Sequence, residues 1–358
     1  MKLKAKFPCA AAGPFYSELR KRVNNHLQEN QISPNANFSM WLKTSIFLST
    51  YICLYLFVLL SPLNLISLSL LTILLGMTAA FVGFNVCHDA IHGSFSESKK
   101  VNRLLGFIFN FLGANPYVWS ITHNVVHHTY TNIAGHDEDI EVAPGLIRIS
   151  EGDELKGFHR YQQWYAFPLY GIASLSWVLR KDYKKFFQAA VGTHTNKHPK
   201  IEYFNLFFYK ALYYFLFLAV PMMVMEIAWY QVIVGFIILH LAQGFTMGLV
   251  FQLAHVVEGT EFPLPDASGN MQEAWAEHQM NTTANFATDC RFSAFFLGGL
   301  NRQIEHHLFP KICHIHYGWI SKIVKTTALE YGLRYNENKT FPLALQSHFN
   351  MLKKMGRG

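Results

Sequence analysis

Eight of the eighteen histidines stand in short motifs whose spacing suits metal binding. His88 and His92, in HDAIH, are four residues apart, so on a helix both rings project from one face and can chelate one ion. HNVVHH repeats this spacing in His123 and His127 and adds His128, whose side chain is turned by about 100° and can reach a second ion. These motifs predict a site with more than one metal.

Two further motifs supply the remaining imidazoles. QIEHH contains His306 and His307, with Gln303 one helical turn earlier, and FQLAHVVE contains His255. Imidazole ligands alone do not choose among iron, zinc, copper and nickel. The number of histidines is more informative, because it exceeds what one tetrahedral zinc site uses. It predicts two metal ions that keep positions open for oxygen.

A pair of redox-active irons can activate O2 and remove hydrogen from an unactivated methylene, which no amino-acid side chain does alone. We therefore expect two non-haem iron ions as cofactors and O2 as co-substrate. Soluble di-iron proteins often use Glu-x-x-His ligands, and the sequence contains none. The predicted catalytic residues are His88, His92, His123, His127, His128, His306 and His307. These seven residues and His255 are the predicted metal ligands.

Two other chemistries stay open at this point. The same metals could hydroxylate or ketolate a lipid or carotenoid. A non-oxidative alternative is a zinc-dependent membrane lipid hydrolase or a metal carrier.

The elements that must position the histidines are membrane spans. Hydrophobic residues make up 51% of the chain and charged residues 15%, against about 25% in ordinary soluble domains. Two almost wholly apolar stretches are each long enough to cross a ~30 Å hydrocarbon core twice. They predict four transmembrane helices in two hairpins, with spans near residues 44–61, 64–86, 211–226 and 230–253.

Basic residues give the predicted orientation. No Lys or Arg occurs between Lys43 and Lys99, nor between Lys210 and Arg291. Because cytosolic loops collect positive charge, both hairpin tips are expected outside. All eight histidines then lie on the cytosolic face of a multi-pass membrane protein.

The predicted fold is all-α, with a cytosolic helical cap that holds the di-metal site. The segments near 103–121 and 158–179 are apolar but interrupted, and we expect them to be interfacial helices. We expect the membrane domain at residues 41–320. The N-terminal segment 1–40 and a C-terminal tail, 321–358, are both expected in the cytosol. The net charge of +7 suits anionic lipid headgroups and not nucleic acid, because the basic residues form no compact cluster.

HDAIH, HNVVHH and QIEHH, in this order around two apolar hairpins, resemble the three histidine boxes of the membrane fatty acid desaturase family. The flanking text is similar too, in HHTYTNIAGHDED, FQLAHVVEGTEFP and GLNRQIEHHLFPKICHIHY. The likeness covers roughly residues 40 to 320. It implies an enzyme that introduces a cis double bond into a fatty acyl chain.

Gln303 stands where many desaturases have the first histidine of the third box. This resembles the front-end subgroup, which inserts a double bond between an existing one and the carboxyl end. The resemblance implies a Δ6- or Δ5-type enzyme acting on an acyl-lipid or acyl-CoA, or a sphingolipid relative. Many front-end enzymes carry a cytochrome b5 domain with a His-Pro-Gly-Gly motif, which is absent here, so a separate ferredoxin or cytochrome b5 is expected as electron donor.

Supporting roles are expected for several other polar residues. Related stearoyl-type desaturases have an asparagine one turn before the histidine that matches His255, and Phe251 stands there instead. Gln303, Gln252 or water are the candidates to complete the coordination. Carboxylates near the motifs are expected to accept hydrogen bonds from ligand imidazoles; they are Asp89, Asp137, Asp139 and Glu305. Among the other histidines, those expected to have structural roles are His240, His278, His314 and His316, and those expected in solvated loops are His26, His136, His159, His194 and His198.

Overall fold

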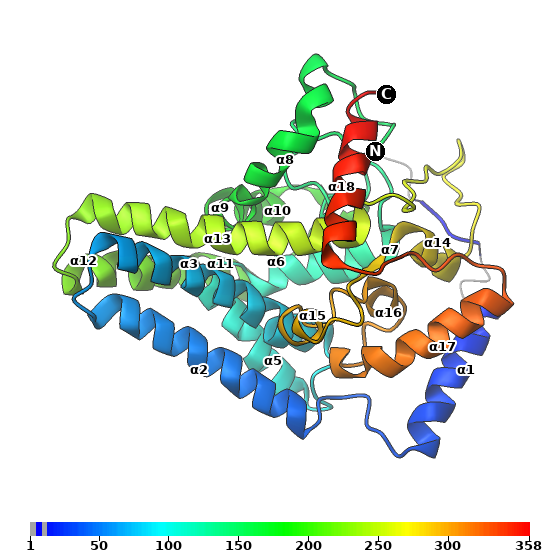
Figure 1. Cartoon of the computed structure of the whole chain (residues 1–358), viewed down its shortest axis with the longest axis horizontal. Coiled ribbons are helices and arrows are strands. Elements are labelled where there is room, and N and C mark those ends of the chain that lie inside the picture. Colours follow the sequence, from blue (N-terminus) through cyan, green and yellow to red (C-terminus); the bar gives the residue numbers. More distant parts are fainter. Residues whose placement is uncertain (1–4, 9–12) are drawn as a thin grey trace.

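The computed structural model describes residues 5–8 and 13–358, which are almost entirely helical. Four helices are long and apolar enough to cross a membrane: Phe38–Leu60, Leu65–His92, Lys200–Val224 and Trp229–His255. In Figure 1 they extend together to the left, and the remaining helices form a cap at their right-hand end. The predicted all-α membrane fold is therefore confirmed.

The bounds of the elements are as follows. The longer helices are α1 (Pro14–Glu29), α2 (Phe38–Leu60), α3 (Leu65–Val82), α5 (Lys99–Phe107), α8 (Gln162–Tyr170), α11 (Lys200–Tyr214), α13 (Trp229–His255), α14 (Trp275–Thr282), α17 (Tyr317–Glu330) and α18 (Phe341–Met355). The shorter helices are α4 (His88–His92), α6 (Pro116–Ser120), α7 (His128–Tyr130), α9 (Ile172–Ser176), α10 (Asp182–Phe187), α12 (Val220–Val224), α15 (Arg291–Phe296) and α16 (Gln303–Leu308).

Several π- and 3₁₀-helical turns and four two-residue strands complete the chain. The π-helical turns are Gly83–Cys87, Ile121–His127, Trp177–Lys181 and Phe215–Ala219, and the 3₁₀ turns are Ile108–Leu112, Gly157–Tyr161 and His314–His316. Strands β1 (Ala190–Val191) and β2 (His194–Thr195) pair antiparallel, and β3 (Asn285–Phe286) and β4 (Glu337–Asn338) pair parallel.

Local sequence fixes where the first hairpin turns. α2 begins after Asn37, whose side chain accepts a hydrogen bond from the backbone N–H of Met40. α3 begins after Asn64, which caps it in the same way by accepting from Ser67. Such caps satisfy amide groups that the first helical turn leaves without partners. The turn at Pro62 between them agrees with the predicted break.

Close backbone contacts join the two hairpins. A side chain at Gly76 of α3 would overlap the carbonyl oxygen of Leu239 in α13. A side chain at Gly244 of α13 would likewise overlap the carbonyl oxygen of Gly171, just before α9. Glycine permits this approach, so α13 packs against both neighbours without a gap.

The predicted interfacial segment near 103–121 is a bent pair of helices. The helical runs Lys99–Leu112 and Pro116–Tyr130 meet at 111°, and Gly113 turns the corner with φ +87°. A buried ion pair holds this corner: Nζ of Lys210 lies 2.7 Å from Oδ2 of Asp182 and donates to the carbonyl oxygen of Gly113. The corner returns the chain toward the cap, where HNVVHH lies.

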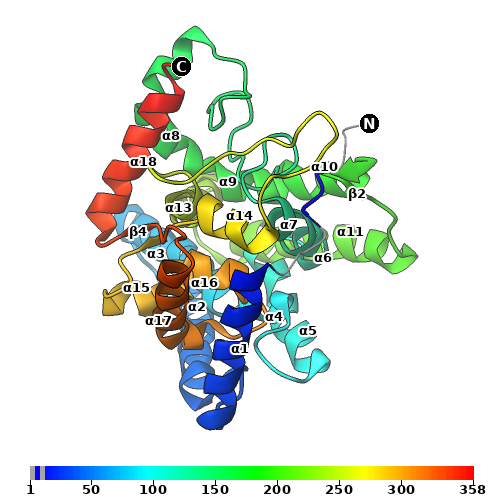
Figure 2. The same ribbon diagram turned by 90° about the vertical axis from the view of Figure 1, so that its right-hand side faces the viewer.

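The cap includes both ends of the described chain. α1 packs against α17 through a core that contains Phe15, Leu19 and Val324. α18 packs against α8 and α13, and Figure 2 shows α1, α14 and α7 neighbouring one another on the face opposite the hairpin tips. The segment expected as a tail, 321–358, thus contributes helices that pack into the cap.

Candidate metal centre

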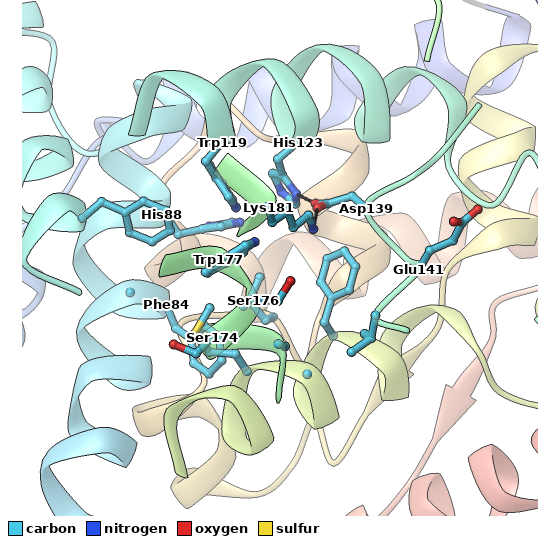
Figure 3. Close-up of a pocket in the computed structure, with 18 residues that line it drawn as sticks. Phe84, His88, Trp119, His123, Asp139, Glu141, Ser174, Ser176, Trp177 and Lys181 are labelled. Carbon is cyan, nitrogen blue, oxygen red and sulfur yellow. Dashed lines mark hydrogen bonds and ion pairs between the residues drawn. The ribbon is translucent and has the colours of Figure 1, made fainter. Parts of the chain in front are cut away.

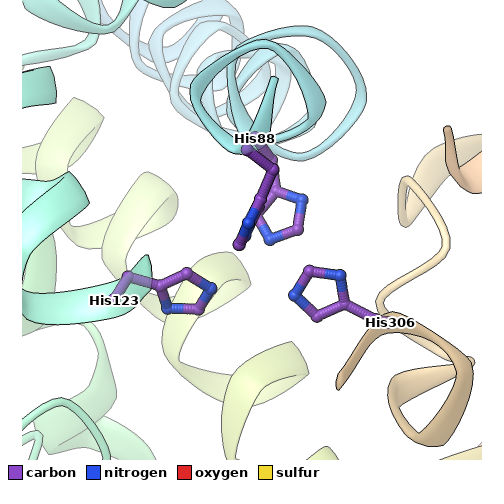
Figure 4. Close-up of side chains that lie close together, drawn as sticks. His88, His123 and His306 are labelled. Atoms are coloured by element: carbon purple, nitrogen blue, oxygen red, sulfur yellow. The ribbon is translucent and has the colours of Figure 1, made fainter. Parts of the chain in front are cut away.

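The eight predicted histidines come together where the spans enter the cap. They lie on α4, on the Ile121–His127 turn and α7, at the last residue of α13, and on α16. All are at most 6% exposed. Figure 4 shows rings from three of these segments, His88, His123 and His306, directed at one common space.

The rings form two main groups. Ligand nitrogens of His88, His92, His123 and His306 lie within 4.8 Å of one another, and so do those of His127, His255 and His307. A third set of the same kind joins His128 to His306 and His307, so His128 lies between the two groups. This arrangement suits a pair of neighbouring metal ions.

The pairing within HNVVHH differs from the sequence-based expectation. His123 and His127 were expected to chelate one ion, but they belong to different groups. The cause is the π-helical turn at Ile121–His127, whose wider turn moves residues four apart out of line. It instead brings Nε2 of His128 within 3.3 Å of Nε2 of His123.

Nitrogen atoms aimed into the centre have no partner among the described residues, which is the pattern a metal would satisfy. Buried imidazole nitrogens are costly unless paired. Those without a hydrogen bond include Nε2 of His88, of His92, of His127 and of His306, and Oε1 of Gln303 is unpaired as well. The donor set therefore fits metal ions that bind imidazole.

Two of the predicted carboxylates, Asp137 and Asp139, hydrogen-bond rings of the histidine groups. Oδ2 of Asp137 lies 2.8 Å from Nδ1 of His127, and Oδ2 of Asp139 lies 3.1 Å from Nδ1 of His123. Lys181 donates to the other oxygen of Asp139 at 2.9 Å. Each carboxylate fixes the tautomer of its ring and directs Nε2 at the centre.

Burial favours the neutral form of His123, His128, His306 and His307, the form of imidazole that binds metal. It lowers the pKa of His123 to about 3, against the opposing effect of Asp139. It also lowers the pKa of His128, His306 and His307 well below the ordinary value, and the neighbouring rings add to the effect. Burial acts to raise the pKa of Asp139, but Lys181 and His123 outweigh it and hold that pKa below its usual range.

The other two predicted carboxylates have different partners. Asp89 accepts from Nδ1 of His314 at 2.8 Å, whereas Nδ1 of His88 is 3.8 Å away. Glu305 accepts from Asn285 and Tyr335, and no imidazole among the described residues donates to it, so the role expected of it was wrong. The reason is that its side chain turns from the centre toward the cap, where burial raises its pKa.

The structure adds three supporting residues that the sequence reasoning missed. Oε1 of Gln279 lies 2.7 Å from Nδ1 of His307, and Thr131 donates to the same oxygen at 2.9 Å. The hydroxyl of Tyr317 lies 3.2 Å from Nδ1 of His306. Neutral side chains far away in sequence carry no motif, and only the fold brings them to the rings.

Gln303 lies at the second group. Its amide nitrogen is placed 2.9 Å from Nε2 of His255 and 3.3 Å from Nε2 of His307. Gln252 instead donates to the carbonyl oxygen of Ile140 at 2.8 Å, which directs it away from the rings. Phe251 packs on the rings of His127 and His255, at centroid distances of 5.1 and 4.9 Å.

A mostly apolar cavity of about 880 Å³, part of it open to solvent, adjoins the first group. His88 and His123 form part of its wall, and Asp139 and Lys181 lie beside His123, with Ser174 on the opposite side (Figure 3). The apolar lining residues include Gly83, Phe84, Phe109, Trp119, Ala173, Trp177, Met247, Gly248, Phe251 and Leu300. Of these, none comes from the Phe- and Tyr-rich segment 203–217. The cavity therefore presents a mostly apolar wall beside the first histidine group.

Other histidines have structural contacts. His240 lies between Ser174 at 2.9 Å and the hydroxyl of Tyr213 at 3.1 Å, which fits the predicted packing role. His136 and His159, expected in solvated loops, are 6% and 2% exposed. That expectation was wrong because loop 131–161 folds onto the cap, where His159 accepts from the backbone N–H of Lys156.

Four helices that could span a membrane, joined to a cap in which two groups of buried histidines could bind metal beside a mostly apolar cavity, define a helical membrane protein with a candidate metal centre. The sequence profile described as "Fatty acid desaturase" matches residues 62–339. The chain is 37% identical to a "sn-1 linoleoyl-lipid 6-desaturase" of Arthrospira platensis, covering 95% of this chain and 92% of that protein. A protein of the same name from Synechocystis sp. is 36% identical, covering 96% of each chain.

A more distant relative is an "Acyl-lipid (8-3)-desaturase" of Physcomitrium patens, which is 32% identical over 96% of this chain and 72% of that protein. The chain belongs to the fatty acid desaturase family. Within it, the chain is a front-end fatty acyl desaturase, an oxidoreductase of membrane lipid metabolism.

Proposed function

We propose that this enzyme holds two iron ions on its histidines and uses O2 to insert a cis double bond at the Δ6 or Δ5 position of an acyl chain carried by a membrane glycerolipid. The observation that supports it most directly is the pair of neighbouring histidine groups, with unpartnered nitrogens, beside an apolar cavity. The relatives named as 6-desaturases and (8-3)-desaturases of acyl-lipids support the position and the carrier.

The proposed ligands are the eight histidines with Gln303. When bound, a pair of redox-active irons supplies the O2 chemistry that removes hydrogen from a methylene. The orphaned Oε1 of Gln303 is a suitable donor, and rotation of its amide would turn that oxygen toward His255 and His307.

The chain's own residues position the substrate. Phe84, Trp119 and Phe251 line the cavity around the rings and exclude water from the reacting carbons. The charged residues that line the cavity are Asp139, Glu141 and Lys181, and Figure 3 shows Asp139 and Lys181 beside His123. We place the ester end of the acyl chain there. A short distance between the carboxyl carbon and the histidines is what front-end chemistry requires.

Expression in a host supplied with C18 acids tests the reaction. The wild type is expected to add a product two hydrogens lighter than its substrate, and His127→Ala, which removes one proposed ligand, is expected to add none. A gain of oxygen in the product would instead indicate a hydroxylase or ketolase. One zinc per chain with no iron-dependent activity would indicate the hydrolytic class.

The active site is proposed to face the cytosol, where a separate ferredoxin or cytochrome b5 supplies electrons. The Lys- and Arg-free hairpins support this orientation. Cys290 is exposed on the cap and provides a test, in a Cys9→Ser, Cys53→Ser background. A membrane-impermeant maleimide is expected to label Cys290 in opened cells only, and labelling of intact cells would contradict the orientation.

A further inference from the structure

A hydroxyl group stands in the apolar part of the cavity wall. Ser174 of α9 lines the cavity beside Ala173, and Figure 3 shows it on the side opposite Asp139. Among the described residues that line the cavity, hydroxyl groups occur only at Ser174 and Ser176. A hydroxyl group in an apolar wall is costly unless it is hydrogen-bonded, so the partners of Ser174 have to be accounted for.

Ser174 belongs to a hydrogen-bond chain of three residues inside the membrane domain. Its hydroxyl lies 2.9 Å from Nδ1 of His240, and Nε2 of the same ring lies 3.1 Å from the hydroxyl of Tyr213. The three residues come from α9, α13 and α11, and each is at most 2% exposed. A side chain at Gly244 of α13 would come within 2.9 Å of the backbone nitrogen of Ser174, so α9 and α13 are in close contact here.

The hydrogens of this chain can be assigned by counting donors and acceptors. A neutral imidazole has one N–H donor and one acceptor nitrogen, and each hydroxyl has one hydrogen to donate. The ring of His240 therefore accepts the hydrogen of one hydroxyl and donates its own to the oxygen of the other. One hydroxyl hydrogen remains, and it belongs either to Tyr213 or to Ser174.

Burial decides between these two hydroxyls. Tyr213 is enclosed in an apolar core with Phe217 and Phe236, and His240 is the only hydrogen-bond partner of its hydroxyl among the described residues. A phenol hydrogen left there would have no acceptor, at the full desolvation cost of a buried polar group. Tyr213 therefore donates to Nε2, and Nδ1–H donates to Ser174. The hydrogen of Ser174 is left for an occupant of the cavity.

The position of Ser174 matches one feature of the substrate. A front-end desaturase inserts its double bond between an existing one and the carboxyl end of the acyl chain. The proposed function places the ester end beside Asp139 and the reacting carbons at His88 and His123, so the existing double bond follows on the far side, where Figure 3 shows Ser174. Beyond the ester, a double bond is the only group of such a chain that can accept a hydrogen bond, through its π electrons.

We propose that the hydroxyl of Ser174, oriented by His240 and Tyr213, recognises the existing double bond of the acyl chain and makes the cavity selective for unsaturated substrates. This inference rests on the proposed function. A saturated chain leaves the same hydrogen without an acceptor, so the hydroxyl acts against the wrong substrate as well as for the right one. Ser174 is the specificity-determining residue, and His240 and Tyr213 are positioning residues.

Ligand binding without turnover tests this proposal. The full-length protein, in detergent and without a reductant, is incubated with radiolabelled 1-oleoylglycerol, which is displaced by unlabelled 1-oleoylglycerol or 1-stearoylglycerol. The acyl chains of these two lipids have the same length and differ in a single cis double bond. The wild type is expected to bind the oleoyl lipid about threefold more tightly, as suits one weak hydrogen bond.

Two variants remove the proposed contact in different ways. Ser174→Ala removes the hydroxyl and is expected to abolish the preference for the oleoyl lipid. Tyr213→Phe keeps the cavity wall intact, because Tyr213 is not one of its lining residues, but it releases the tautomer of His240 and is expected to reduce the preference. Thermal unfolding in detergent checks the fold of both variants, and Tyr213→Phe still tests the proposal where Ser174→Ala does not fold.

Ser69→Ala is the matched control. Ser69 is a partly exposed serine of α3, and its hydroxyl donates to the carbonyl oxygen of Leu65 in its own helix. This variant loses the same atoms as Ser174→Ala, but outside the cavity, and is expected to keep the threefold preference.

The outcomes separate this inference from the proposed function. An oleoyl preference that survives in Ser174→Ala would show that the cavity selects for the bend of the chain, and would overturn the inference. An unchanged preference in Tyr213→Phe would overturn the roles of His240 and Tyr213. Equal wild-type affinities, in a protein that desaturates C18 acids in the host, would overturn the inference alone. A wild type that prefers the oleoyl lipid but adds no double bond in the host would overturn the proposed function instead.

Discussion

Oδ2 of Asp137 lies 2.8 Å from Nδ1 of His127, and Nε2 of the same ring faces the second histidine group without a hydrogen-bond partner. One carboxylate therefore sets both the tautomer and the direction of a proposed ligand. Asp137 also accepts from the backbone N–H of Asn132, so the loop that follows α7 is tied to the same oxygen. Replacing this carboxylate should disturb metal binding without altering the packing volume.

Asp137→Asn is expected to lower metal affinity or desaturation by about 10- to 100-fold, because the ring loses its fixed acceptor. Elemental analysis of the purified protein and the yield of unsaturated product measure the two effects. Asp289→Asn changes an exposed carboxylate on the cap and serves as the control. Full metal content with full activity in Asp137→Asn would show that this hydrogen bond is dispensable.

Ala173 lines the apolar cavity, and the adjacent Ile172 is 44% exposed on the outside of the same helix. Ala173→Leu places a larger side chain in the cavity. We expect this overpacking to weaken the binding of an acyl chain there by about 1–3 kcal/mol. We expect conversion of C18 chains to fall by about tenfold or more relative to C16 chains. Gas chromatography of total lipids measures the ratio. Ile172→Phe should leave it unchanged, and an equal ratio in both variants would remove Ala173 from the substrate path.

Gly244 and Gly235 provide a matched pair on α13. A side chain at 244 would overlap the carbonyl oxygen of Gly171, whereas nothing lies within 4 Å of one at 235. Gly244→Ala is expected to destabilise the protein by about 1–3 kcal/mol through overpacking. Gly235→Ala is expected to be neutral or to stabilise by up to about 1 kcal/mol, since alanine is the better helix former. Thermal unfolding in detergent compares them, and the reverse order would show that the α13–α9 contact is loose.

His348 predicts a pH dependence of stability. Its Nδ1 lies 2.6 Å from the carbonyl oxygen of Val256 and its Nε2 2.7 Å from the hydroxyl of Tyr170. Burial lowers its pKa from 6.5 to about 4. The unfolded chain therefore binds the proton more readily, and the stabilisation present above pH 6.5 is progressively lost as pH falls toward 4.

This shift corresponds to about 3 kcal/mol at most. We expect the thermal midpoint to fall between pH 6.5 and 5, and to fall less steeply in His348→Gln, which has no proton to gain. His194→Gln, at a partly exposed histidine of β2, is expected to keep the wild-type slope. A wild-type midpoint that does not change over this range would contradict the prediction.

The sequence predicted the fold and the set of site histidines because both depend on strong local signals. Apolar length and the placement of Lys and Arg located the hairpins, and HDAIH, HNVVHH and QIEHH marked the segments that bear the rings. The division of the rings into groups was not predictable, because it depends on the π-helical turn before His128, which has no signature in residue type. Gln279 and Tyr317 were missed for a related reason, since each meets its histidine only after the cap has folded.

The π-helical turn Ile121–His127 also fixes the number of residues that the second box, HNVVHH, has to contain. A π turn accommodates one residue more than an α turn, so it behaves as a retained insertion. Deleting a residue such as Val125, which is 45% exposed, would restore an α-helix and carry His127 and His128 round by about 100°. Changing the identity of that residue leaves the count intact. The segment is therefore expected to tolerate a helix-compatible substitution at position 125 but not a change in the number of residues.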